Sequence, residues 1–274
     1  MASTLHRASR PEVEARARDW AEIQERMLVP LYESVYDRLE VGSDTRLLAL
    51  GCGSGLALLL AAGRGAAVTG CDTDASRLAL ARARFAPAPG WDAPARRPAP
   101  AATLVQGPPA RADLGGGYDV VTAFDPAQPE AELRPALDAL AGRVRRGAAV
   151  VLAGWGPPER CATSRVLRVA ARLAAPDGPS AYDLRLSGRD DLEELARAAG
   201  LRPDGSGRVS CPFGYPDVRS AVRGLVSTGL FDAAVAATDR GQVGKEIAEA
   251  LHPYRRPDGS VRMENVFRYV VARV

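Results

Sequence analysis

The sequence predicts an α/β fold with a mainly parallel β-sheet. Three observations support this: apolar strands alternate with helical segments between residues 46 and 153, a glycine-rich turn follows the first strand, and an acidic residue follows the second. Strands that alternate with helices form right-handed βαβ units, which place the strands side by side and parallel.

The N-terminal segment predicts a helix. Between residues 11 and 40, apolar side chains recur every three or four positions: Trp20, Ile23, Met27, Leu31, Val35 and Leu39. This spacing is typical of an amphipathic helix with one buried face. Pro30 lacks the N–H that a helix interior needs, so we expect a kink or a split there.

Strands and helices then follow one another. The strands are expected at 46–50, 67–71, 102–106, 118–124 and 148–153, and the helices at 56–62, 75–85 and 130–142. Five prolines between residues 86 and 101 predict an extended loop. The remaining elements are expected as helices at 190–199, 218–228 and 242–251 and as strands at 208–212 and 261–274.

Composition favours one globular domain and excludes several other classes. The chain has 274 residues, of which 46% are hydrophobic and 25% charged, and a formal net charge of +3. Basic and acidic residues are interspersed, so no face is expected to bind nucleic acid. No apolar run has the length of a membrane span, and no apolar signal core lies near the N-terminus.

The four cysteines do not have the spacing of a metal site or a redox pair. They are Cys52, Cys71, Cys161 and Cys211, and none lies in a C-x-x-C motif. We expect buried, reduced thiols, a cytoplasmic location and no bound metal.

A glycine-rich turn joins the first strand to the next helix. It reads Gly51-Cys52-Gly53-Ser54-Gly55, and glycines there allow a sharp turn and a close approach of the backbone to a ligand. An ordinary tight turn can have the same composition. However, Asp72 follows the second strand, 21 residues after Gly51, where an acid can accept hydrogen bonds from ribose hydroxyls. The combination favours a nucleoside site.

The turn favours a nucleoside ligand without phosphate groups. A dinucleotide-binding turn has a third glycine where Leu56 stands, which makes a nicotinamide dinucleotide a distant alternative. The sequence G-x-x-x-x-G-K-[ST] does not occur, so a phosphate-binding P-loop is excluded.

At this point the chain resembles a known family. The segment LLALGCGSG resembles motif I of class I S-adenosylmethionine (SAM)-dependent methyltransferases, and VTGCDTD and YDVVTAFDP resemble the second- and fourth-strand motifs. The segments RRGAAVVLAGWGPPERC, WAEIQERMLVPLYESVYDRL and MENVFRYVVARV resemble the type 11 small-molecule methyltransferases of actinobacteria. The resemblance covers nearly the whole chain.

The resemblance implies a Rossmann-like, seven-stranded class I methyltransferase fold whose last strand is antiparallel. N-terminal helices and a small helical lid, inserted before the last strand, accompany the sheet. We expect a single domain over residues 1–274: a helical cover at 1–42, a Rossmann-like core at 43–212, a lid at 213–260 and the final strand at 261–274.

The resemblance also implies SAM as the cofactor and assigns residues to it. Gly51, Cys52, Gly53 and Gly55 would line the methionine and ribose parts. Asp72 would bind the ribose, with Thr73 beside the adenine. Pro108, Pro109 and Ala110 would pack near the adenine, and Phe124 and Asp125 would face the methionine end and the acceptor.

The sequence departs from the family pattern at two places. Ala49 stands where members usually carry an acid that braces the loop near the SAM ammonium. Pro108 and Pro109 stand where an acid usually reaches the adenine amino group. Both changes lower the expected affinity for SAM unless Asp74, Asp113 or Asp125 compensates.

Three residues are candidates for a catalytic role. Asp125 follows a parallel strand at the end where α/β sheets place ligands, with capping of the next segment as the alternative. His252 follows a helix, and a helix-terminal partner is the favoured interpretation. Tyr32 lies on the N-terminal helix, one turn from Tyr36, where packing is an equal alternative.

The sequence therefore predicts a SAM-dependent methyltransferase that acts on a small molecule, in bacterial secondary metabolism, as a monomer or homodimer. One alternative is an enzyme of the same fold used for a non-methylating reaction such as a cyclisation or rearrangement. Another is a non-catalytic binding or partner-activating protein.

Overall fold

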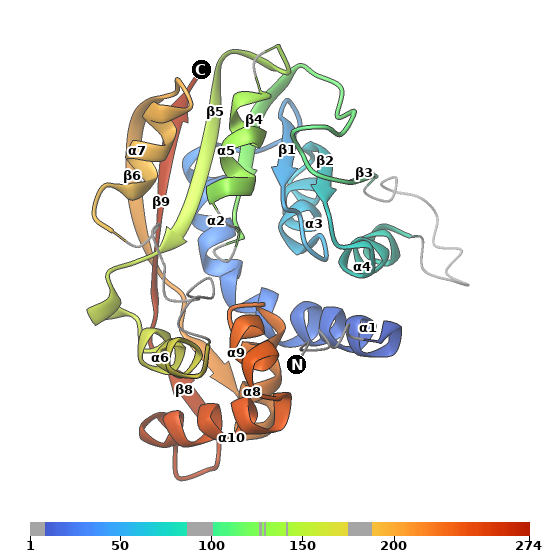
Figure 1. Ribbon diagram of the computed structural model, residues 1–274. Helices are drawn as coiled ribbons and strands as arrows, with labels where there is room; N and C mark the ends of the chain where they lie inside the picture. The colour runs from blue at the N-terminus through green and yellow to red at the C-terminus, as the bar shows by residue number, and fades with distance from the viewer. Residues whose placement is uncertain (1–8, 87–100, 126–127, 129, 141, 175–187) are drawn as a thin grey trace, which may run out of the picture. The chain divides into compact units, whose positions relative to one another are not determined.

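The computed structural model describes residues 9–86, 101–125, 128, 130–140, 142–174 and 188–274 (Figure 1). Most of the predicted proline-rich loop at 86–101 lies outside them. The chain forms two compact units, each described by itself. Unit 1 contains Met1–Pro30, Trp155–Asp191 and Arg208–Arg268, and unit 2 contains Leu31–Gly154, Leu192–Gly207 and Tyr269–Val274.

The strands are β1 (Arg46–Leu50), β2 (Ala67–Asp72), β3 (Ala102–Gln106), β4 (Tyr118–Ala123), β5 (Val144–Trp155), β6 (Arg202–Ser210), β7 (Phe213–Tyr215), β8 (Val261–Met263) and β9 (Val266–Arg273). The α-helices are α1 (Arg10–Asp19), α2 (Val29–Arg38), α3 (Leu56–Gly63), α4 (Ala75–Phe85), α5 (Glu130–Asp138), α6 (Thr163–Leu173), α7 (Asp191–Ala198), α8 (Val218–Ser227), α9 (Asp232–Ala237) and α10 (Arg240–Ala250).

The main sheet has seven strands in the order β3-β2-β1-β4-β5-β9-β6. The pairs β1–β2, β2–β3, β1–β4 and β4–β5 are parallel, with Leu48 of β1 opposite Thr69 of β2 and Val121 of β4. Most residues of β1, β4 and β5 are buried, as expected for central strands that are covered on both faces. The predicted Rossmann-like class I methyltransferase fold is confirmed.

The last strand runs antiparallel to β5, as predicted. The Gly147 N–H donates to the Val274 carbonyl and the Val274 N–H donates to the Ala148 carbonyl, both at 3.3 Å. At the other end of the two strands, the Gly156 N–H donates to the Val266 carbonyl at 2.7 Å. The start of β5 therefore pairs with the end of β9, and the end of β5 with the start of β9, which is the arrangement of an antiparallel pair.

Strand β6 is longer than predicted. It begins at Arg202 rather than at residue 208. The prediction missed the first half because that half contains proline and glycine and therefore has the composition of a loop. Such residues are tolerated in an edge strand. Arg38 of α2 supports this edge: its Nη1 lies 2.7 Å from the Ser206 carbonyl oxygen, and its guanidinium lies 5.6 Å from the centroid of the Tyr269 ring.

The N-terminal helix is split, as predicted. α1 passes into a π-helical turn at Trp20–Gln24 and a 3-10 turn at Glu25–Leu28 before α2 begins at Val29. Pro30 is the second residue of α2, where its missing N–H costs no internal hydrogen bond. The irregular turns therefore precede the proline, and the division between the two units follows it.

Unit 1 joins N-terminal residues to α8 and α9. Arg223 of α8 donates from Nε to the buried Asp19 carboxylate at 3.1 Å, and Arg16 of α1 donates to Asp232 at 2.9 Å. At Gly224, a Cβ would lie 2.8 Å from Ile23, so α8 approaches the N-terminal segment closely there.

Several elements of unit 1 were not predicted. The helices α6 and α9 and the strand β7 were missed, whereas α8 and α10 confirm two predicted helices. The final strand predicted at 261–274 is divided into β8, which pairs with β7, and β9. α6 has a strongly apolar face, and the side chains of Val166, Leu167 and Val169 are buried. The region 213–260, predicted as a helical lid, therefore begins with a short strand.

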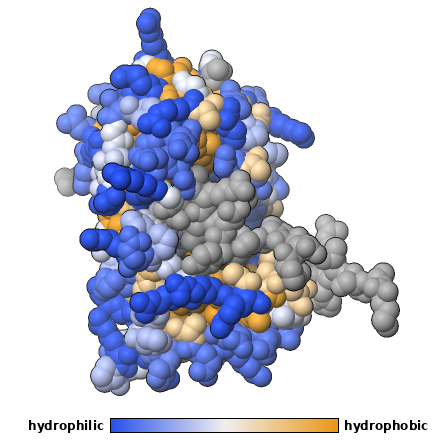
Figure 2. Space-filling model, turned by 60° about the vertical axis from the view of Figure 1, so that its left-hand side comes forward, coloured by the Kyte–Doolittle hydropathy of each residue, from blue (hydrophilic) through white to orange (hydrophobic). Residues whose placement is uncertain are grey.

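Large apolar side chains are largely buried throughout the described residues. Only Val13 and Val274 are exposed among them, and the face drawn in Figure 2 is mostly hydrophilic with smaller apolar areas. All four cysteines are buried and none forms a disulfide, as predicted. No helix in the described part of the chain is long and apolar enough to cross a membrane.

Gly207→Ala is expected to destabilise the protein because β6 lies against the ring of Tyr269. A Cβ at Gly207 would lie 2.5 Å from that ring. Overpacking of this kind costs about 1–3 kcal/mol in the free energy of unfolding, measurable by urea denaturation. Gly214→Ala in β7 is the control, because nothing lies within 4 Å of its Cβ. Equal stability of the two variants would contradict the close packing.

Asn265→Ala is expected to lower the free energy of unfolding by about 1–3 kcal/mol. The Asn265 side chain is 1% exposed, and its oxygen accepts from the Thr163 N–H at 3.1 Å, at the start of α6. The substitution leaves that buried N–H unpaired. Glu264→Ala removes only an exposed ion pair to Arg262 and is expected to change stability by less than about 0.5 kcal/mol. A similar loss of unfolding free energy in both variants would show that the hydrogen bond from Thr163 to Asn265 does not stabilise the protein.

Candidate cofactor site

The glycine-rich turn of unit 2 has a backbone that only glycine adopts without strain. Gly51, Gly53 and Gly55 have φ angles of 68°, 56° and 80°. The Gly51 and Cys52 N–H groups donate to the Cys71 carbonyl at 2.8 and 3.0 Å, which ties the turn to the end of β2. The predicted sharp turn between β1 and α3 is therefore present.

Two glycines serve close packing. A Cβ at Gly55 would lie 2.9 Å from the Cβ of Ala81, so this glycine lets α3 and α4 approach each other. Gly70 of β2 was missed by sequence reasoning, and a Cβ there would lie 2.4 Å from Leu58 and 2.8 Å from the Cys52 sulfur. A glycine inside a strand was the available signal.

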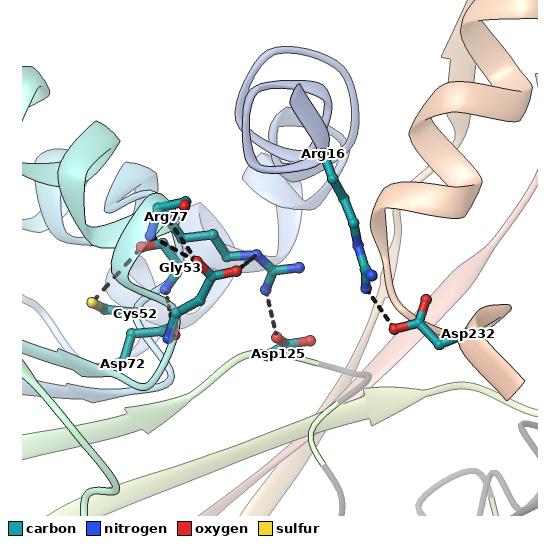
Figure 3. Close-up of polar contacts among 9 residues, drawn as sticks. Arg16, Cys52, Gly53, Asp72, Arg77, Asp125 and Asp232 are labelled. Carbon is teal, nitrogen blue, oxygen red and sulfur yellow. Dashed lines mark hydrogen bonds and ion pairs between the residues drawn. The ribbon is translucent and has the colours of Figure 1, made fainter. Parts of the chain in front are cut away.

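Asp72 is the central acid of the site. Its side chain is 7% exposed, and its two oxygens accept from the Gly53 N–H and the Asp74 N–H, each at 2.8 Å (Figure 3). Burial raises the pKa of Asp72, while these hydrogen bonds and the nearby Arg77 oppose the rise. Each carboxylate oxygen has a second lone pair, so Asp72 can also accept hydrogen bonds from ribose hydroxyls.

Asp125 pairs with a residue that sequence reasoning did not single out. Its Oδ2 lies 3.4 Å from Nη1 of Arg77 in the first turn of α4, and both side chains are mostly buried. Asp74 caps the same helix by accepting from the Ser76 and Arg77 N–H groups. Because β1 lies between β2 and β4, this ion pair spans the carboxyl end of β1. Figure 3 shows the Arg77 guanidinium directed toward Asp125, and Asp72 beside Gly53.

Phe124 belongs to an aromatic cluster with two tyrosines of α2. Its ring centroid lies 5.0 Å from that of Tyr32 and 6.0 Å from that of Tyr36, and all three residues are buried. The Tyr36 hydroxyl donates to the Ala57 carbonyl at 3.0 Å. Burial raises the pKa of Tyr36 above its usual range. The structure thus places Tyr32 beside the residue that precedes Asp125, in a packing position.

The predicted adenine side follows β3. The Gly107 N–H donates to the Asp72 carbonyl at 2.9 Å, so the turn after β3 begins beside the central acid. Pro109 is buried and its carbonyl accepts from Arg143 at 3.2 Å, whereas Ala110 is half-buried and Thr73 is exposed. These residues gather at the carboxyl ends of β2 and β3.

Two further candidates lie in unit 1. His252 is exposed in the 3-10 turn that follows α10, and its carbonyl accepts from the Arg255 N–H. Its catalytic role stays a prediction. Trp155, at the end of β5, is buried against Phe213 and Phe267, with ring centroids at 5.9 and 4.5 Å, which is a packing position.

Comparison with known proteins agrees with this geometry. Residues 48–152 match the family model of a methyltransferase domain, type 11. No curated protein matches the sequence. The matched segment runs from β1 into β5 and contains the glycine turn, Asp72 and Asp125.

Solved structures share the fold. A candidate methyltransferase from Bacillus halodurans matches with a TM-score of 0.55 and 13% identity, over 88% of this chain and 97% of that one. YjhP from E. coli matches with a TM-score of 0.54 and 19% identity, over 96% and 100%. The [4+2]-cyclase SpnF matches with a TM-score of 0.51 and 17% identity, over 89% and 80%.

Sheet order, strand directions and the matched segment agree. Residues 48–152 match the family model of a methyltransferase domain, and the chain has the fold of the class I SAM-dependent methyltransferases.

Proposed function

We propose that the protein is a SAM-dependent methyltransferase that acts on a small molecule. The observation that carries the proposal is the buried Asp72 carboxylate, hydrogen-bonded to the glycine turn at the carboxyl end of β2. In open α/β sheets, ligands bind outside the carboxyl ends of the strands, and an acid at this position binds ribose hydroxyls.

The residues at this end of the sheet fit SAM. The positive φ angles of the turn direct backbone groups toward a ligand without an intervening Cβ, and Asp72 has lone pairs left for the ribose. Pro109, Ala110 and Thr73 would flank the adenine. Phe124 and Asp125 would lie toward the methionine end, with Arg77 holding the Asp125 carboxylate in place.

The cofactor, when bound, supplies an activated methyl group, and the protein's task is to align the acceptor with it and exclude water. Some enzymes of this kind need no general base, because the methyl group is already activated. The candidates for moving a proton in this chain are Asp125, Tyr32 and His252. Of these, Asp125 is favoured because it follows the parallel strand β4 at the end of the sheet where ligands bind.

The acceptor, setting and partners belong to the same proposal. Interspersed charges argue against nucleic acid and membranes as partners, so we propose a small-molecule substrate in bacterial secondary metabolism. Buried cysteines without disulfide bonds favour a cytoplasmic location. A monomer or homodimer is expected.

A second candidate is a non-methylating reaction such as a cyclisation. It is favoured by the likeness to a [4+2]-cyclase of the same fold and by Ala49, which is buried in β1 where methyltransferases usually carry an acid. The two candidates differ in product: methyl transfer releases one S-adenosylhomocysteine for each turnover, whereas a cyclisation leaves SAM unchanged.

Asp72→Asn is expected to weaken the binding of SAM and S-adenosylhomocysteine at least tenfold, measured by calorimetry. The amide keeps only one acceptor oxygen and loses the charge that strengthens hydrogen bonds to ribose, which is worth about 1.5–3 kcal/mol. Asp204→Asn, an exposed acid paired with Arg273, is the control and is expected to leave affinity unchanged. The absence of binding to the unchanged protein at millimolar ligand would refute the proposed cofactor site.

A further inference from the structure

The side chain of Gln128 lies against the glycine turn of unit 2. A Cβ at Gly51 would be 3.3 Å from Oε1 of Gln128 and 3.8 Å from its Nε2. This Oε1 is shielded from solvent and has no hydrogen-bond partner among the described residues. Buried amide oxygens are normally paired, because an unpaired one has lost its water without a replacement. The oxygen is therefore available to a donor at the first glycine of the turn.

The donor expected there is the ammonium group of an amino-acid ligand. Ala49, two residues before Gly51, carries no acid, and it is buried between Gly70 of β2 and Thr122 of β4. Position 49 thus contributes only a methyl group, and a ligand ammonium at this turn needs an acceptor from another element.

The acids that could compensate are engaged elsewhere. Asp74 caps α4, and Asp125 pairs with Arg77. Asp113 accepts from the Gly115 N–H at 3.4 Å and is exposed. In addition, the pKa of Asp72 is raised mainly by burial and further by the Asp125 charge, so a third carboxylate nearby would add repulsion. A neutral amide oxygen accepts a hydrogen bond without adding negative charge.

We propose that Gln128 Oε1 accepts a hydrogen bond from the α-ammonium of SAM and thereby replaces the acid that is absent at Ala49. The inference rests on the proposed function and assigns Gln128 to binding and positioning of the cofactor. It concerns only the amino-acid part of the ligand, whereas Asp72 acts on the ribose.

The test compares two ligands that differ in that part. S-adenosylhomocysteine carries the ammonium, and 5′-methylthioadenosine keeps the nucleoside and the thioether but has no amino-acid group. Calorimetry with the full chain is expected to show Gln128→Met binding S-adenosylhomocysteine about tenfold more weakly, with 5′-methylthioadenosine unchanged. Gln128→Glu is expected to restore or tighten the binding of S-adenosylhomocysteine alone. Asp72→Asn is the matched control and is expected to weaken both ligands.

The outcomes separate the two proposals. Equal losses for both ligands in Gln128→Met, or no loss for either, would overturn the role of Gln128 while leaving the cofactor site intact. Failure of the unchanged protein to bind either ligand would overturn the cofactor site and the inference together. Thermal melting of each variant shows whether it is folded, and Gln128→Ala, which also removes the acceptor oxygen, repeats the test at the same position if Gln128→Met does not fold.

Discussion

The hydrogen bonds that Asp72 accepts hold the candidate site together. One carboxylate oxygen binds the Gly53 N–H of the turn after β1, and the other binds the Asp74 N–H at the start of α4. A single buried charge thereby fixes two backbone segments that leave neighbouring parallel strands. The cost of burying this charge appears in the raised pKa of Asp72, and the two N–H donors and Arg77 reduce it.

A second constraint is the ion pair between Arg77 and Asp125, which passes across the carboxyl end of β1. Arg77 comes from the helix after β2 and Asp125 from the segment after β4, and β1 lies between those strands. Their ion pair therefore spans the end of the strand that carries the glycine turn. The aromatic cluster of Phe124 with Tyr32 and Tyr36 anchors the same segment from α2, so Asp125 is held by charge on one side and by packing just before it.

The departures from the methyltransferase pattern have a structural explanation. Ala49 is buried in β1 opposite Gly70, and the absence of a side chain at Gly70 lets α3 pack closely on β2. Pro109 is buried beside Arg143 and supplies a carbonyl rather than a carboxylate. With the amide of Gln128 proposed as the acceptor for the ligand ammonium, fewer negative charges lie near Asp72 than an additional acid would give.

The sequence by itself determined the fold class, because strand and helix periods alternate strongly from residue 46 to 153 and the glycine turn and Asp72 lie at fixed places in that alternation. It also indicated the split before α2, since a proline acts locally. Only the tertiary structure decided which residues that are distant in the sequence come into contact. Arg77 and Gln128 have no local signal, and β6 has the composition of a loop that becomes a strand only beside Arg38 and Tyr269. Such contacts depend on sheet order and edge pairing, which no short stretch of sequence encodes.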